Sequence, residues 1–189
     1  MSRLVGSANV LDQPLYDTVQ LPIVAGPQVV NFFAIPVGGA FTAAIAKTWE
    51  HTNLVQAGRI ETGNELMITA VSMYVKTQAG GGAGVTLADA SAVSSGYCQL
   101  RIGQVTYLTL PNQMIPNGGA EIVANGNAAA ASTHVTHSVS AISNRFHLKN
   151  TFVLEADESV QVECHVTAAI AAVTDLVFVL WGDYTRPVR

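Results

Sequence analysis

The chain has 189 residues, of which 49% are hydrophobic and only 12% are charged, about half the usual charged share of roughly 25%. A net charge of -4 and the lack of any Lys- or Arg-rich run exclude nucleic-acid binding through a basic surface. No stretch reaches the roughly 18 apolar residues of a membrane-spanning helix, and the first six residues lack the apolar core of a signal peptide.

The first half of the chain predicts an arm followed by three strands. Residues 1–14 lack periodicity and predict an arm that is mobile or bound by a partner. Residues 16–23 and 29–35 have the apolar content and turn-forming flanks of two strands. The polar segment 48–64 predicts a long connection with one helical turn. Residues 65–76 give the clearest strand, with apolar side chains on both faces.

The middle of the chain predicts one short helix and several more strands separated by loops of unequal length. The helix is expected over residues 86–94, and two strands are expected over 97–102 and 104–110. Weaker strand character is present in four further segments, which are 121–124, 135–142, 145–148 and 151–154.

The last forty residues predict a closing pair of antiparallel strands. Residues 159–166 alternate polar and apolar without a break, which is typical of a strand with one buried face. Residues 176–181 are apolar throughout, as a strand covered on both faces would be.

These patterns predict an all-β protein with little helix. Short strands joined by unequal loops favour a Greek-key sandwich or single jelly roll of about eight strands over residues 15–189, preceded by the arm. Cys98 and Cys164 both fall in predicted strands, so we expect two small, buried side chains that stay reduced in an intracellular compartment.

No residue pattern in the chain predicts catalysis or a bound metal. His134 and His137 form the only close histidine pair, but positions i and i+3 of a strand point to opposite faces. Glu155, Asp157 and Glu158 lie between two predicted strands and indicate a solvated turn. With no nucleophile elbow and no cupin-type histidine pair, we expect no catalytic residue, no cofactor and no metal, and therefore no enzymatic activity.

The two tryptophans lie in different contexts. Trp181 closes an apolar strand and is expected in the core. Trp49 lies in a polar connection, where it must be exposed or must anchor the loop against the sandwich or a neighbouring molecule. The alternative is a sugar-stacking platform that also uses His51 and Asn53.

Four segments in this order carry a resemblance to a known group of proteins. Residues 32–39 read FFAIPVGG, residues 52–59 read TNLVQAGR, a strand begins at Glu65, and residues 182–188 read GDYTRPV. Together they resemble jelly-roll capsid proteins of bacteriophages, particularly the single-jelly-roll major capsid proteins of tailless, membrane-containing phages. The resemblance implies two four-stranded sheets, subunits joined into capsomers, and no enzymatic activity.

A charge-poor surface and an N-terminal arm also suit a protein that packs against copies of itself. We therefore expect a viral structural protein that is made in the host cytoplasm and located in the virion. Its partners would be its own copies, other capsid proteins and a possible internal viral membrane. Trp49, Arg186 and Arg189 are the candidate interface residues, the two arginines by pairing with acidic groups of a neighbour. The alternative is a β-sandwich module that binds carbohydrate or another ligand.

Overall fold

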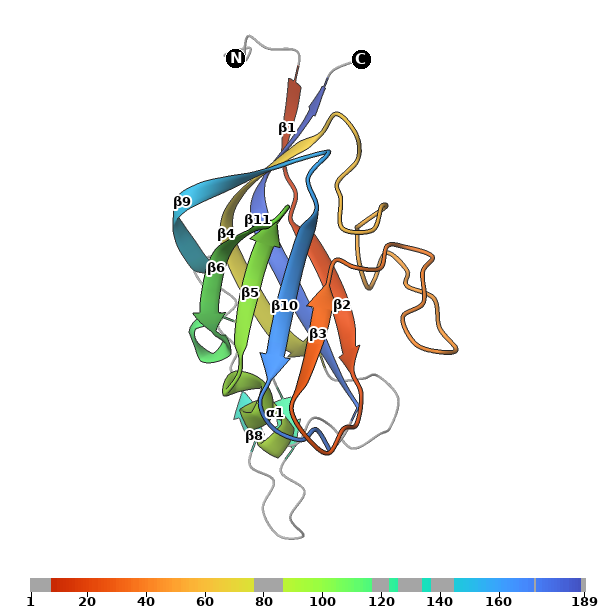
Figure 1. Ribbon diagram of the computed structural model, residues 1–189, viewed down its shortest axis with the longest axis vertical. Helices are drawn as coiled ribbons and strands as arrows, with labels where there is room; N and C mark the ends of the chain where they lie inside the picture. The colour runs from red at the N-terminus through yellow and green to blue at the C-terminus, as the bar shows by residue number, and fades with distance from the viewer. Residues whose placement is uncertain are drawn as a thin grey trace.

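The structure, a computed structural model, describes residues 8–76, 87–116, 123–125, 134–136, 145–171 and 173–187. Two antiparallel sheets lie face to face and form a sandwich, with both ends of the described chain at one tip (Figure 1). The prediction of an all-β fold with little helix is confirmed. Within the described residues, no helix is long and apolar enough to cross a membrane.

The larger sheet has five strands in the order β1-β11-β4-β9, with β2 pairing along a second stretch of β11. Its strands are β1 (Ala8–Asp12), β2 (Leu15–Leu21), β4 (Glu65–Lys76), β9 (Phe146–Glu155) and β11 (Thr174–Pro187). The predicted strand over residues 65–76 is therefore confirmed at both ends, and the closing strand is longer than predicted.

The smaller sheet has four strands in the order β3-β10-β5-β6. Its strands are β3 (Gln28–Phe32), β10 (Val160–Val166), β5 (Tyr97–Ile102) and β6 (Val105–Pro111). The remaining elements are the short pair β7 (Val123–Asn125) and β8 (His134–Thr136), helix α1 (Leu87–Ser94) and the 3-10 helix η1 (Asn112–Met114).

The eight strands of the sandwich other than β1 pair in a nested order along the chain. The first pairs with the last (β2 with β11), the second with the seventh (β3 with β10), the third with the sixth (β4 with β9) and the fourth with the fifth (β5 with β6). A long antiparallel hairpin that is rolled up on itself gives this order.

The core lies between the two sheets and follows the alternation of the strands. Every second residue of β10, from Val160 to Val166, is buried. Phe32 of β3 and Phe178 of β11 meet across the sandwich with ring centroids 5.5 Å apart, and complete burial of such a side chain contributes roughly 1.5–3 kcal/mol. Residues 176–180 of β11 are buried on both faces, as the apolar run over residues 176–181 predicted, and the buried stretch also includes the polar residues Thr174 and Asp175.

The N-terminal arm differs from the prediction in its second half. Residues 8–12 form strand β1, which pairs with residues 183–187 of β11, from Ala8 opposite Pro187 to Asp12 opposite Asp183. Pro14 separates β1 from β2, because proline has no N–H to donate to a neighbouring strand. Residues 1–7 lie outside the described residues.

Strand β9 also differs from the prediction, which divided it into two strands. The structure has one strand whose register against β4 shifts, so that Ile68 faces Phe152 whereas Ala70 faces His147. The extra residues of β9 form a bulge, which interrupts the alternation that a sequence pattern relies on. The predicted strands 121–124 and 135–142 fall partly outside the described residues, which include β7 and β8 there.

Trp181 is not a core residue, and the prediction for it was wrong. Its side chain is half-buried, its indole N–H donates to Ser72 Oγ at 2.8 Å, and the Arg145 guanidinium carbon lies 3.4 Å from the ring centroid. The guanidinium covers the ring in a cation–π contact, so the tryptophan is shielded by a charged side chain and not by the sandwich core.

Gly182 lies at the irregularity of β11 and tests how closely β11 and β4 approach. A Cβ atom at this position would lie 2.0 Å from the Met67 carbonyl oxygen. We expect Gly182→Ala to lower the free energy of unfolding by roughly 1–3 kcal/mol, because the backbone of β4 must move. Urea denaturation would measure the loss. Gly26→Ala is the control, since a Cβ there meets nothing within 4 Å; equal losses in both variants would contradict the close approach.

Candidate functional site

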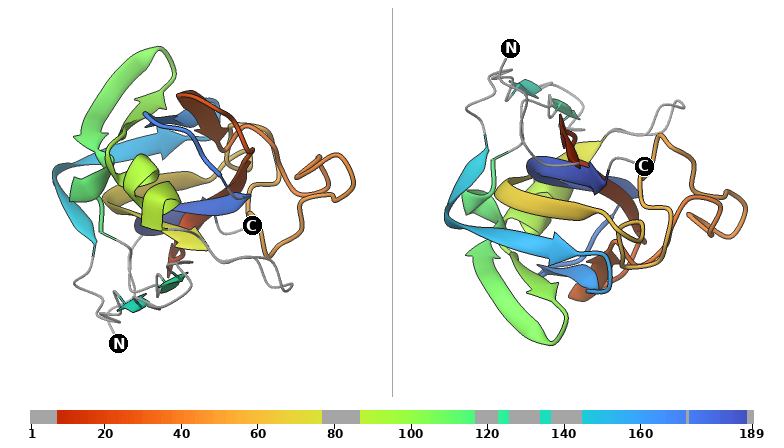
Figure 2. Two further views of the ribbon diagram at one scale, coloured as in Figure 1. Left: turned by 90° about the horizontal axis from the view of Figure 1, so that it is seen from below. Right: turned by 90° about the horizontal axis from the view of Figure 1, so that it is seen from above.

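The connection between β3 and β4, residues 33–64, projects from one side of the sandwich (Figures 1 and 2). It has no helix or strand of its own beyond short turns and isolated bridges. Four of its large apolar side chains are exposed, namely Ile35, Ile45, Trp49 and Val55, with exposed fractions of 39%, 54%, 59% and 47%. Because this segment has no helix or strand, its shape must be held by contacts with other parts of the chain. These contacts are made with strand β2.

A buried carboxylate on β2 holds the start of this connection. Asp17 is fully buried, its Oδ1 accepts from the ammonium group of Lys47 at 2.5 Å, and its Oδ2 accepts from the backbone N–H of Phe33 at 2.6 Å. Burial raises the pKa of Asp17, whereas the charge and hydrogen bond of Lys47 and the bonds from Phe33 and Thr52 act in the opposite direction. The ion pair with Lys47 and the hydrogen bond from Phe33 therefore tie two distant parts of the connection to Asp17 on β2.

Phe33 itself marks the turn at which the chain leaves β3. It is fully buried and has a positive φ of 65°, a conformation that a bulky residue rarely adopts. Its N–H is bound by Asp17 and its carbonyl accepts from Gly58 N at 2.7 Å. These bonds from both sides hold the unfavourable backbone conformation in place.

The segment around Trp49 is fixed along the outer edge of β2. The backbone N–H of Tyr16 donates to Asn53 Oδ1 at 2.9 Å, and Asn53 Nδ2 donates to the Pro14 carbonyl at 2.7 Å. The Tyr16 hydroxyl donates to the Trp49 carbonyl. Of the two roles predicted for Trp49, the anchoring of the loop thus belongs to Asn53 and Tyr16, while the indole ring is exposed.

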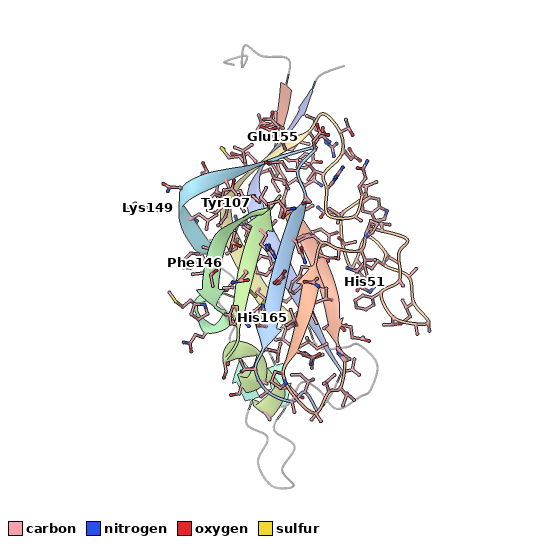
Figure 3. The ribbon with its side chains drawn as sticks, viewed as in Figure 1. His51, Tyr107, Phe146, Lys149, Glu155 and His165 are labelled. Atoms are coloured by element: carbon pink, nitrogen blue, oxygen red, sulfur yellow. The ribbon has the colours of Figure 1, made fainter. Side chains whose placement is uncertain are left out.

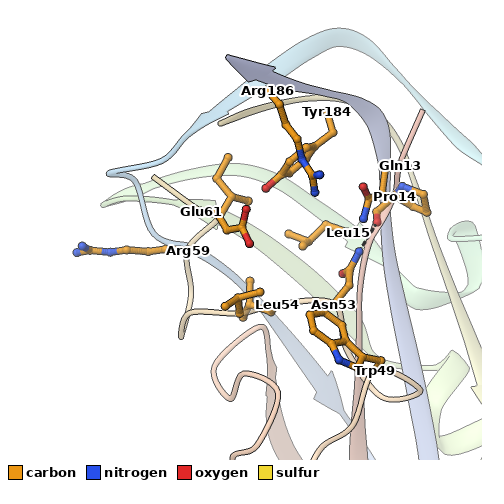
Figure 4. A pocket seen from close by; sticks show the side chains of 12 residues that line it. Gln13, Pro14, Leu15, Trp49, Asn53, Leu54, Arg59, Glu61, Tyr184 and Arg186 are labelled. Atoms are coloured by element: carbon orange, nitrogen blue, oxygen red, sulfur yellow. Dashed lines mark hydrogen bonds between the residues drawn. The ribbon is translucent and has the colours of Figure 1, made fainter. Parts of the chain in front are cut away.

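A small pocket of about 70 Å³ lies beside the Trp49 ring (Figure 4). Its wall comes from three separate parts of the chain, which are residues 13–15, residues 49–61 and the end of β11. Arg186 contributes a guanidinium carbon 5.4 Å from the Tyr184 ring centroid, whereas Arg59 points away from the pocket (Figure 4). Glu61 also lines the pocket, and its Oε2 accepts a hydrogen bond from Asn64 Nδ2 at 3.2 Å.

The pocket brings together two of the three predicted interface residues. Trp49 and Arg186 are far apart in the sequence and line the same hollow. The third, Arg189, lies outside the described residues. Ile35, Ile45 and Val55 were missed from the sequence. Ile35 was assigned to the predicted strand 29–35, whereas β3 ends at Phe32, and only Val55 gave a signal, as a large apolar residue in the polar segment 48–64.

The residues predicted for the sugar-binding alternative are largely engaged within the protein. Asn53 uses both ends of its amide to hold β2. His51 contacts the Thr48 hydroxyl through Nδ1 at 2.9 Å and packs on Phe41 with ring centroids 4.3 Å apart. The exposed ring of Trp49 is the part of this predicted set that is available to a ligand.

The other polar residues of interest do not converge. Figure 3 shows His51, Glu155 and His165 on separate parts of the molecule. Glu155 and Glu158 close the turn between β9 and β10, where the Glu158 N–H donates to the Glu155 carbonyl at 3.1 Å, so the predicted turn is confirmed. Across the described ranges, no three His, Cys, Asp or Glu side chains are grouped to hold a metal ion. The side chains of His134 and His137 lie outside the described residues.

The pocket and the connection around it combine groups that are common at protein contacts. They offer an exposed indole, a guanidinium stacked on a tyrosine, and a rim of apolar side chains on a backbone that is hydrogen-bonded to β2. No family model, curated protein or solved structure matches this chain.

The Asp17–Lys47 pair can be tested by removing the cation. We expect Lys47→Met to lower the free energy of unfolding by roughly 3–5 kcal/mol at neutral pH, because a buried carboxylate is left without its counter-charge. Arg101→Met is the matched control, since the Arg101–Glu163 pair is partly exposed and should contribute roughly 0–1 kcal/mol. Chemical denaturation would measure both, and similar losses would refute the structural importance of Lys47.

The same variant has a defined pH dependence. Burial raises the pKa of Asp17 above its ordinary 3.8, and loss of Lys47 removes the main opposing effect. Above 3.8 the unfolded chain then ionises before the folded one, so the folded state binds more protons and stability falls as the pH rises. The deficit of Lys47→Met relative to the natural protein should therefore grow from about pH 4 to pH 7. Denaturation curves across this range would measure it, and a constant deficit would contradict the assignment.

Proposed function

We propose that this chain is a non-enzymatic structural protein, a single-jelly-roll capsid subunit that assembles with its own copies into the shell of a phage. Other virion proteins would be its further partners, with a viral membrane as a possible layer beneath the shell. The nested pairing of the eight sandwich strands is the observation that carries the proposal.

The strand order supports the jelly-roll description. Rolling an eight-stranded antiparallel hairpin places the first strand beside the last, the second beside the seventh, and so on inwards. The observed pairs follow this rule, and they are β2·β11, β3·β10, β4·β9 and β5·β6. Eight strands in two sheets with this pairing are typical of a jelly roll, which consists of two Greek keys. Capsid proteins are one of the classes that use this architecture.

The surface supports self-association. Only 12% of the residues are charged, so burying this surface against a neighbour leaves few charges to desolvate. The projecting connection adds exposed apolar side chains, and Trp, Tyr and Arg meet at its pocket. These three residue types dominate the binding energy of many protein interfaces. We therefore place a contact between subunits at the Trp49 pocket and the connection around it.

The assembly state tests the function. Purified protein at high concentration is expected to form capsomers, rings or shells, which light scattering after size-exclusion chromatography and negative-stain microscopy of the same fractions would detect. A monomer of about 20 kDa at every concentration and salt condition would overturn the proposal.

A charge placed in the projecting connection tests where the contact lies. Ile45→Asp should dissociate the assemblies or weaken them at least tenfold, because a carboxylate would be buried without a partner. The control is Val105→Asp on β6. Val105 and Ile45 have similar exposed fractions of 55% and 54%, but Val105 lies outside the projecting connection. If Val105→Asp disrupts assembly and Ile45→Asp does not, the contact lies elsewhere.

The exposed ring of Trp49 favours a second candidate, a carbohydrate-binding module. In that case a glycan array should give a defined set of ligands, and Trp49→Ala should abolish the signal while the protein stays monomeric and folded. Assembly without glycan binding would exclude this alternative. Glycan binding that survives Trp49→Ala would place the sugar site outside the pocket.

A further inference from the structure

The two cysteines face each other directly across neighbouring strands. Cys164 of β10 is the register partner of Cys98 of β5. Both side chains point into the core, with exposed fractions of 0% and 3%, and both are free thiols. Directly opposed residues of antiparallel strands have Cα atoms about 4.5–5.5 Å apart, which lies within the range of roughly 4.4–6.8 Å found in disulfides.

The two thiols have different neighbouring side chains. The Asn112 side-chain amide lies 3.5 Å from Cys164 Sγ and is held there by donating to the Val93 carbonyl at 2.7 Å. Cys98 Sγ lies 3.8 Å from the thioether sulfur of Met73. Cys164 therefore has a neighbouring amide donor and faces the Cys98 thiol across the strand pair, whereas Cys98 lies against a thioether.

We propose that Cys98 and Cys164 form an oxidative modification site, at which hydrogen peroxide closes an intramolecular disulfide between β5 and β10. The inference does not depend on the capsid role, and either can fail while the other stands.

The donors around Cys164 make it the thiol that reacts first. The hydrogen bond from Cys98 lowers the pKa of Cys164, and the Asn112 amide acts in the same direction against the effect of burial. The same hydrogen bond raises the pKa of Cys98, with burial adding to the increase. The thiolate is the nucleophilic form, so Cys164 is the attacking sulfur and Cys98 the resolving one.

The chemistry requires a small oxidant because the site is enclosed. The Cys164 thiolate attacks one peroxide oxygen, the O–O bond breaks, and the released hydroxide takes up a proton and becomes water, leaving a sulfenic acid. Cys98 then attacks the sulfenic sulfur, the S–O bond breaks, and a second water leaves with the Cys98 proton. Two thiols and one peroxide thus give one disulfide and two waters. A bulky disulfide oxidant would have to pass through a mixed disulfide that the packed core cannot hold.

The disulfide would join the two middle strands of the four-stranded sheet. Since it would close a long loop in the unfolded chain, it should stabilise the fold and raise Tm by roughly 5–15 °C. The reduced and oxidised protein would then share one fold and differ in resistance to unfolding.

The test is to treat the full-length reduced protein with hydrogen peroxide and then to denature it, alkylate it and measure its mass. The expected product has lost two hydrogens, takes up no alkyl group, yields a peptide linking Cys98 to Cys164, and regains two alkylatable thiols after dithiothreitol. Its Tm should rise and return on reduction.

Cys98→Ala and Cys164→Ala are the matched controls. Cys98→Ala leaves Cys164 without a resolving thiol, so peroxide should add oxygen to it and Tm should not rise, while Cys164→Ala should react more slowly. Persistence of both thiols in the natural protein after prolonged treatment would overturn the proposal. Separate oxygen addition to each cysteine, or a disulfide between chains, would overturn it as well. These readouts use the natural protein and remain decisive if a variant does not fold.

Discussion

Strand β11 is the element on which the rest of the structure depends. It runs for 14 residues, pairs with β4 along one edge, and pairs with β2 and then β1 along the other. Residues 174–180 are buried, so the first half of the strand contributes apolar burial as well as two sets of backbone hydrogen bonds. Its far end, which pairs with β1 and with the start of β4, supplies Tyr184 and Arg186 to the pocket. The same strand therefore fixes the sheet and one wall of the candidate contact site.

The second wall of the pocket is linked to β11 through β2. Because β2 is held by β11, Asp17 has a fixed position, and through Lys47 and Phe33 it fixes the long connection that follows β3. A buried ion pair is a costly way to hold a loop, since both charges must leave water. Asp17 offsets this cost with several donors, and the benefit is a defined shape in a segment that has no sheet of its own. The pocket thus follows from backbone pairing and one buried carboxylate.

Sequence patterns predicted the elements whose alternation is regular and failed where tertiary contacts decide. Strand β5 was predicted at its observed limits because buried apolar and more exposed residues alternate along it, and β4 because its apolar residues fill both faces between Glu65 and Lys76. Strand β1 has no such period, and it exists because the end of β11 lies beside it. The bulge in β9 broke the alternation and made one strand look like two. Trp181 looked like a core residue because its neighbours are apolar, yet a cation from outside its strand covers it.

The candidate sites show the same division. That Trp49 stands out in a polar connection is visible in the sequence, but its proximity to Arg186 depends on the course of β11. Likewise, Cys98 and Cys164 were expected to be buried, whereas their direct opposition is a property of the register between β5 and β10. Lys47 gave no signal at all, because its partner is on a strand that precedes it by thirty residues.

A surface with few charges has a consequence for how this protein could recognise a partner. Several of its charged side chains are themselves buried, including Asp17, Lys47, Asp89 and Asp175, so fewer remain to steer an encounter or to reject a wrong partner. Specificity must then come from shape and from a small number of fixed groups. The Trp49 pocket meets this requirement, because Asn53 and Tyr16 hold its backbone against β2 while the indole ring stays exposed. A pre-formed contact of this kind loses little conformational entropy on binding, which makes association feasible for a neutral surface.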